Sequence, residues 1–511
     1  MAVETSKMLE TIQQAAKPHD NYQFEIKLDY EIQEGKKTAY KVSTYIFIPP
    51  SLGINKHSYS KEDFYRDIQN YIRLKTPTLI LREFTEHSAS PLNAIKKIIA
   101  TEGWSHKPAQ REQLIGNFKL LSAMLKSSLR EHFGLIRKRI EEAPPDSKIS
   151  RIIVNLIEEF LTESEKISHS YRWFYPTFNL PNVDETLFAA YKFTDESISL
   201  MIEEGSIEMF QIVERYLKKS DQPLFLHKLN EQREAEIKHR KSLGYSSILI
   251  EGDDNEEYLF TISALKKYAS SVLYLATAVK REATAWEHIF YAIAAGISMI
   301  FATVIAFYFQ YVYGIFTFPV FVALVVGYMF KDRIKEIGRT LFARYLQNIL
   351  PDHKIIIRTQ DGEHKLGILK EKVRFVKEKD IPRPVLRARN RDQITDLNND
   401  GQPELIICYS KEIVLFTNAF KRIFVTAPQI TGLNDITRYD IRAYLRKMDE
   451  PQQPKIYLDE GELKTILCHR VYHLNIITRY RSILPYKDKV HKHIRLILTR
   501  AGIKRVENVS V

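Results

Sequence analysis

Residues 289–330 read IFYAIAAGISMIFATVIAFYFQYVYGIFTFPVFVALVVGYMF, a run of 42 residues without one Asp, Glu, Lys or Arg. The chain as a whole is 27% charged, so this run stands apart from its surroundings. A helix needs about 20 apolar residues to cross the ~30 Å of hydrocarbon in a bilayer. The run is therefore too long for one crossing and about right for two, and Gly314 and Pro319 predict a break between them. We expect a transmembrane helical hairpin, 288–309 and 315–330, rather than a buried helical pair in a soluble core.

Basic residues flank the run on both sides and are absent from its centre. Lys280 precedes it, and Lys331 and Arg333 follow it. Because positive charge stays on the cytoplasmic side of membrane helices, we expect an inner (cell) membrane protein with both termini in the cytoplasm. The polar first 20 residues contain no apolar core, so no signal peptide is predicted. The chain has two cysteines, Cys408 and Cys468, which excludes a disulfide framework.

Hydrophobic periodicity divides the remaining residues into a helical part and a β-rich part. Residues 22–49 alternate with period two, which predicts a β-hairpin, and residues 91–243 repeat every three or four, which predicts a helical bundle. Ser60 with Asp63 resembles a capping box, from which a helix is expected to run to Thr76. Strand-like runs return after Pro351 and are interrupted by one helix at about 434–448.

The expected fold is an α+β integral membrane protein. No Gly or Pro occurs between Gly252 and Gly296, so one helix is expected to run from about residue 255 into the membrane. The predicted parts are a polar tail (1–20), a β-hairpin plus helical domain (21–250), a helical stalk (251–287), the transmembrane hairpin (288–330), a second helical stalk (331–350) and a basic β-rich cytoplasmic domain (351–511).

Small residues recur every four positions inside the charge-free run. They are Ala294, Ser298, Ala302 and Ala306 in its first half and Ala323 and Gly327 in its second half. Small residues at this spacing let helix backbones approach closely. Two interpretations stay open, packing of the two spans on each other and a seam between copies of the chain. The run carries no intramembrane charge, which argues against a pump or a proton relay.

The excess positive charge lies entirely after the hairpin. Residues 331–511 contain 36 Lys and Arg against 22 Asp and Glu, a difference of +14, and the rest contain 39 against 41, a difference of −2. Such asymmetry indicates an anionic partner. Because neither a recognition helix nor stacking aromatics are evident, nucleic acid is disfavoured and anionic lipid is the predicted partner. The candidate binding residues are Arg387, Arg389, Arg391, Lys487, Lys489, Lys492 and Arg495.

Asp396, Asn398, Asp400 and Glu404 place oxygen-bearing side chains around Gly401, a pattern typical of calcium loops. The ten residues 396–405 resemble the loops of FG-GAP propeller repeats and of dockerins, which implies calcium as a bound ion. An Asn/Asp/Gly turn between two strands explains the same residues without a metal. Both interpretations stay open.

The chain carries no set of catalytic motifs. Glu236 and His239 form a single ExxH on a helix, where a di-iron bundle needs two, so an exposed charged face is expected. Nucleotide-binding, kinase, nucleophile-elbow and zinc-finger patterns do not occur, and no motif set points to a known family. We expect a cytoplasm-facing scaffold or tether that binds a protein partner. The alternatives are a membrane-tethered enzyme without a motif-like site and an oligomeric channel or translocation component built from the hairpin.

Overall fold

The computed structural model describes residues 14–32, 38–142, 149–217, 219, 221–280, 283–315, 317–390, 402–423, 430–484 and 487–509. The chain divides into two compact units, which we call the β unit (1–72, 275–420 and 433–511) and the helical unit (73–274 and 421–432). Helices and strands are both abundant, so the expected α+β class is confirmed.

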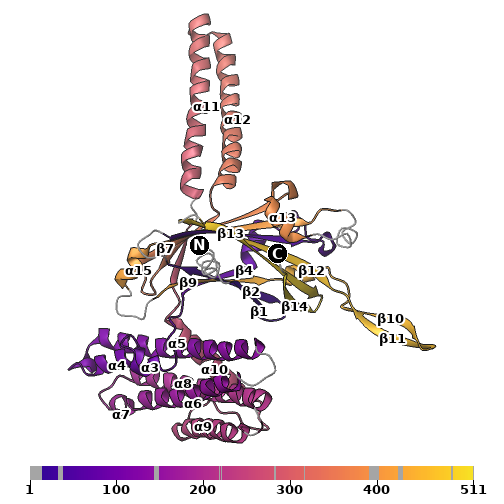
Figure 1. The fold of residues 1–511 in the computed structure, drawn as a ribbon. Coiled ribbons are helices and arrows are strands. Elements are labelled where there is room, and N and C mark those ends of the chain that lie inside the picture. The colour runs from indigo at the N-terminus through magenta and orange to yellow at the C-terminus, as the bar shows by residue number, and fades with distance from the viewer. Residues whose placement is uncertain are drawn as a thin grey trace. The chain divides into compact units, whose positions relative to one another are not determined.

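Eight strands of the β unit form one antiparallel sheet (Figure 1). Their order is β14 (Gly502–Val509), β13 (Lys487–Thr499), β12 (Tyr472–Leu484), β3 (Thr38–Ile48), β8 (Leu405–Leu415), β7 (Lys365–Val376), β6 (His353–Arg358) and β5 (Ala276–Lys280). A second sheet has the order β1 (Gln14–Pro18), β2 (Gln23–Glu31), β9 (Gly432–Asp440) and β4 (Ile68–Leu74). Strands β10 (Gln452–Asp459) and β11 (Glu462–His469) form a separate two-stranded arm.

The N-terminal strands belong with the C-terminal ones. An N-terminal hairpin is present, but it pairs β2 with β1, whereas β3 lies between β12 and β8 in the large sheet. Tyr45 of β3 stands opposite Ile477 on one side and Cys408 on the other. Nearly every residue of β3 is buried, which is the pattern of a central strand covered on both faces. The structure therefore does not follow the expected division into 21–250 and 351–511.

Two predicted helices are replaced by strands over part of their length. Helix α2 (Lys61–Arg66) begins at the Ser60–Asp63 capping box, as predicted, but it ends at Asp67 and β4 follows. Buried Ile68 and Ile72 are four residues apart, which fits a helical stripe and an alternating strand equally well. Likewise β9 replaces the first half of the helix expected at 434–448, and only the short α16 (Arg442–Leu445) is helical there.

The helical unit is a bundle with an aromatic and aliphatic core. Its helices are α3 (Glu83–Glu86), α4 (Pro91–Ile99), α5 (Pro108–Glu141), α6 (Ile149–Arg172), α7 (Tyr175–Phe178), α8 (Glu185–Tyr216), α9 (Gln222–Leu243) and α10 (Glu256–Ser271). Tyr171 of α6 stacks on Tyr191 of α8 with ring centroids 4.8 Å apart, and the ring of Phe118 of α5 packs edge-on to both. Gly205 of α8 allows a close approach to α6, because a Cβ there would lie 2.9 Å from the ring of Phe160.

The continuous helix expected from residue 255 into the charge-free run is not formed. Helix α10 ends at Ser271, and β5 follows before α11 (Ala283–Tyr313) begins. Pairing with β6 gives the backbone of residues 276–280 hydrogen-bond partners along one edge, so sheet formation overrides the helical pattern. After α11 the chain returns in α12 (Phe318–Ile349), antiparallel to it (Figure 1). The helical pair is thus an insertion between neighbouring strands, and Lys280 and Lys354 are direct partners across them.

Candidate functional site

The α11–α12 hairpin carries an extensive exposed apolar surface. One helix there, His288–Tyr313, is long and apolar enough to cross a membrane. Only 11% of its most apolar window is buried, so the described chain does not itself cover it. Side chains such as Ile300, Phe307 and Tyr311 are exposed in α11, and Phe318, Phe321 and Tyr328 are exposed in α12.

Helix α12 is apolar over a shorter length than α11. Its charge-free helical part runs from Phe318 to Phe330, and Lys331, Asp332 and Arg333 follow without a break in the helix. Thirteen helical residues are about 20 Å long at 1.5 Å per residue, which is less than the ~30 Å of a hydrocarbon core. The two legs of the hairpin are therefore unequal in apolar length.

The small residues of the charge-free run lie in the seam between the two helices. Ala294, Ser298, Ala323 and Gly327 are buried, and Ala302 and Ala306 are half-buried. A Cβ on Gly338 would lie 3.0 Å from the Cβ of Ala294, and one on Gly327 would lie 3.6 Å from Ile305 Cγ2. These contacts join α11 to α12 within one chain, as in the first of the two interpretations of the small residues.

A buried ion pair links the two sheets of the β unit. The Nζ of Lys411 on β8 donates to Asp435 Oδ1 and Oδ2 on β9 at 2.8 and 2.9 Å. It also donates to Thr437 Oγ1 at 2.6 Å and to Asn70 Oδ1 at 2.9 Å. Lys411 stands between Tyr409 and Ile413 on the inward side of β8. A lysine at a core position of an alternating strand is therefore the feature of the sequence from which this buried ion pair could have been predicted.

The same cluster extends to β7. Asn70 Nδ2 donates to Glu371 Oε1 at 2.8 Å, and the hydroxyl of Tyr409 donates to the same oxygen at 2.7 Å. Burial raises the pKa of Glu371, and burial together with the nearby Glu371 raises the pKa of Tyr409 well above its usual range. Every charged member of this network has hydrogen-bond partners, so the arrangement serves to join the two sheets.

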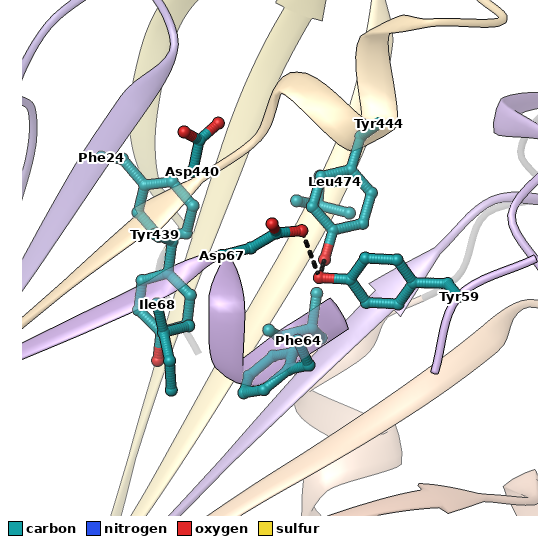
Figure 2. A pocket seen from close by; sticks show the side chains of 10 residues that line it. Phe24, Tyr59, Phe64, Asp67, Ile68, Tyr439, Asp440, Tyr444 and Leu474 are labelled. Carbon is teal, nitrogen blue, oxygen red and sulfur yellow. Dashed lines mark hydrogen bonds between the residues drawn. The ribbon is translucent and has the colours of Figure 1, made fainter. Parts of the chain in front are cut away.

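A small cavity lies between the sheets (Figure 2). Figure 2 shows Tyr59, Asp67 and Tyr444 pointing toward one another, with the Tyr59 hydroxyl donating to Asp67 Oδ2 at 2.9 Å. Phe24 and Tyr439 stack at its side with ring centroids 4.7 Å apart. The cavity encloses about 10 Å³, which is room for about one water molecule. It is too small for an organic substrate.

The helical unit contains a second buried polar cluster, which includes the predicted ExxH. Arg172 donates to both carboxylate oxygens of Glu236 at 3.1 and 2.5 Å and to Asp195 Oδ1 at 3.1 Å. His239 Nε2 lies 2.7 Å from Asp195 Oδ2, which also accepts from the hydroxyl of Tyr245 at 3.1 Å. Burial alone would raise the pKa of Asp195, but hydrogen bonds and charge from His239 and Arg172 lower it. The expectation of an exposed charged face was therefore wrong, because Glu236 is buried by helix packing.

The predicted calcium loop lies largely outside the described residues, since Asp396, Asn398 and Asp400 fall there. Glu404 is described, and its Oε1 accepts from Arg389 Nη2 at 2.8 Å in a buried ion pair. Among the described residues no group of three or more His, Cys, Asp or Glu is placed to hold a metal ion.

The residues of the predicted basic surface that the structure describes differ in burial. Arg389 is buried on the helix α13 (Arg383–Arg389), so it is not available to an anionic surface. Arg387 is exposed on the same helix, and Lys492 and Arg495 are half-buried on β13. Arg391 and the side chains of Lys487 and Lys489 lie outside the described residues.

The β10–β11 arm carries an exposed apolar face. Leu458 stands opposite Leu463, and Ile456 stands opposite Thr465, so these four side chains share one face of the arm. Ile456, Leu458 and Leu463 are exposed, as is Leu467. Asp459, Glu460 and Glu462 make the tip of the arm acidic.

Comparison with models of protein families, with curated proteins and with solved structures gives no match to this chain.

Proposed function

We propose that this protein is a membrane-anchored tether, held in the inner membrane by the α11–α12 hairpin with its two folded units on the cytoplasmic side. The observation that carries the proposal is the exposed apolar surface of the hairpin. Removing one large apolar side chain from water is worth about 1.5–3 kcal/mol. An isolated pair of helices exposing Ile300, Phe307, Phe318 and Phe321 to water would aggregate, whereas lipid covers such a surface without further protein contacts.

The position of the hairpin in the β unit supports a single anchoring point. Because Lys280 and Lys354 are partners on neighbouring strands, the chain leaves the sheet and returns to it at the same place. The loop at Gly314 is at the opposite end of the hairpin from both strands. Lysine and arginine occur in the part of α12 that leads back to β6, beginning at Lys331, and at Lys280 on β5, and none stands in the loop. Because positive charge stays on the cytoplasmic side of membrane helices, this distribution supports a cytoplasmic position for both units.

The proposed partners follow from the same geometry. The basic residues that begin the charged half of α12 would meet anionic headgroups of the cytoplasmic leaflet, where each basic residue near the surface contributes about 1 kcal/mol. Arg387, Lys492 and Arg495 remain candidates for the same partner, without Arg389. A tether also needs a protein to hold, and we propose that the units outside the membrane bind it.

The experiment replaces residues 283–349 with a short Gly-Ser linker, which joins β5 to β6 directly. The Lys280–Lys354 pairing makes this closure compatible with both strands. In flotation of cell membranes after alkaline carbonate extraction, the full chain should float with lipid and the linker variant should stay in the soluble fraction.

The control is the far-ultraviolet circular dichroism of the linker variant, which should keep its strand signal. A full chain that is extracted by carbonate, or a folded linker variant that still floats with lipid, would overturn the proposal.

A further inference from the structure

The β10–β11 arm has one apolar face and one mixed face. Its strands are joined by the two-residue turn Glu460–Gly461, in which the φ values are both positive, 52° and 89°. Turns of this kind match the right-handed twist of a hairpin and fix its register. Because direct partners across two strands share a face, one face carries Pro454, Ile456, Leu458, Leu463, Thr465 and Leu467. On the other face Tyr457 and Ile466 alternate with Lys455, Lys464, Asp459 and Glu462.

The described part of the chain does not cover the apolar face of the arm. Ile456, Leu458, Leu463 and Leu467 are 72%, 68%, 77% and 57% exposed. A two-stranded hairpin by itself is at best marginally stable in water, and neighbouring exposed aliphatic side chains of this kind mark interaction sites. Adding a strand to an edge of the arm would leave this face in water. The occupant that the arm needs therefore lies against the face itself.

The two ends of the apolar face carry opposite charge. The tip, residues 459–464, has three carboxylates and one lysine, a net charge of −2. The base, which we define as residues 446–450 with Arg470 and Arg500, has four basic and two acidic residues, a net charge of +2. Arg470 and Arg500 belong to the base because they form ion pairs with Asp449, at 2.9 Å, and with Glu450. A face with an apolar middle and opposite charges at its ends is complementary to a second copy of itself turned end for end.

The size of the face sets the strength of such a pairing. Strands β10 and β11 have eight residues each, so the arm is about 26 Å long at ~3.3 Å per residue, and two strands are about 10 Å wide. Two faces of this size bury no more than the low end of specific interfaces, which is about 1,200 Å² in total. We therefore expect a reversible dimer with a dissociation constant of roughly 1–100 μM rather than an obligate one.

We infer that the apolar face of the β10–β11 arm binds the same face of a second copy of this chain. The two arms pack face to face about 10 Å apart and run in opposite directions. The twofold axis passes near Ile456 and Thr465, the middle pair of the face, and the acidic tip of each arm lies at the basic base of the other. An anionic lipid surface is disfavoured as the occupant, because it would repel the carboxylates of the tip. The inference goes beyond the proposed tether and does not depend on membrane anchoring.

The test compares two double variants of the full chain in mild detergent by sedimentation velocity, at about 1–200 μM to bracket the expected dissociation constant. Leu458→Ser with Leu463→Ser changes the apolar face, and Tyr457→Ser with Ile466→Ser changes the other face. All four side chains are exposed, so neither variant loses a buried contact within the chain. The first variant should bind itself at least about 100-fold more weakly than the unchanged chain, and the second should match the unchanged chain. An unchanged chain that stays monomeric, or equal dissociation constants in the two variants, would overturn the inference.

Crosslinking of single cysteines tests the orientation of the two arms. Cys468→Ser removes the exposed native thiol, and Cys408 is buried. With a short bis-maleimide, Thr465→Cys should link two copies, because it lies near the twofold axis. Lys464→Cys on the other face and Glu460→Cys at the tip should not. Equal linking at 464 and 465 would show that the apolar face is not the contact, and linking at 460 instead of 465 would show that the tips meet, so either result contradicts the inference.

Discussion

Replacing Lys411 with Met should destabilise the β unit by about 3–5 kcal/mol, because the carboxylate of Asp435 would be left buried without its charge partner. The ammonium lies 2.8 and 2.9 Å from the two Asp435 oxygens, and the residues are 3% and 1% exposed. At this burial water cannot replace the lost contacts. The hydrogen bonds from Lys411 to Thr437 and Asn70 are lost as well and contribute to the same range.

Amide hydrogen exchange along β8 measures this loss in the β unit separately from the helical unit. A change of 3–5 kcal/mol speeds exchange by about 10²–10⁴, at 1.4 kcal/mol per factor of ten. The matched control is Lys411→Met combined with Asp435→Asn, which removes both charges and should recover at least half of the loss. Acceleration of less than about fivefold in the single variant, or no recovery in the double variant, would refute the reasoning.

Gly205→Ala should lower the melting temperature of the helical unit, because its Cβ would lie 2.9 Å from the Phe160 ring and overpacking costs about 1–3 kcal/mol. A raised melting temperature in calorimetry would contradict this and would mean that the higher helix propensity of Ala outweighs the close contact. Arg389→Met should cost about 3–5 kcal/mol in urea unfolding, because it removes the charge that pairs with buried Glu404. The exposed Arg387→Met should stay within about 0.5 kcal/mol, and equal losses in the two would contradict the burial argument. Burial and the charges of Arg389 and Arg495 lower the pKa of His493 to about 4. The folded-state pKa of His493 lies below the unfolded value near 6.5, so its contribution to the free energy of unfolding is present above pH ~6.5 and is lost as the pH falls through about 4, by up to about 3 kcal/mol. A titration of the His493 ring near pH 6.5 in nuclear magnetic resonance would exclude this.

Local patterns predicted the features that depend on neighbours in the chain. The capping box at Ser60 and Asp63 needs only four consecutive residues, and it starts α2 as expected. The helices of the bundle follow from apolar residues spaced by threes and fours. Where a local pattern fits two periods, as at Ile68 and Ile72, the sequence gives no decision, and pairing with distant strands makes β4 out of an expected helix.

The candidate sites show the same limit. From their local context Arg389 was assigned to the basic surface and Glu404 to the calcium loop, and the fold joins them in one buried ion pair. Glu236 looked like part of an exposed helix face until α6 and α8 placed Arg172 and Asp195 around it. Their burial depends on which helices pack together, and periodicity within one helix does not encode that choice.

By itself the sequence determined the charge-free hairpin at 289–330, the α+β composition and the local starts of helices, because each of these depends on hydropathy or hydrogen bonding between residues close along the chain. Only the tertiary structure decided that β3 enters the large sheet between β12 and β8, that Lys411 meets Asp435, and that charged residues of α12 lie beside the apolar middle of α11. These contacts join residues that are far apart in the sequence or on separate elements, and the free energy that selects them comes from burial shared between elements, which no single segment carries.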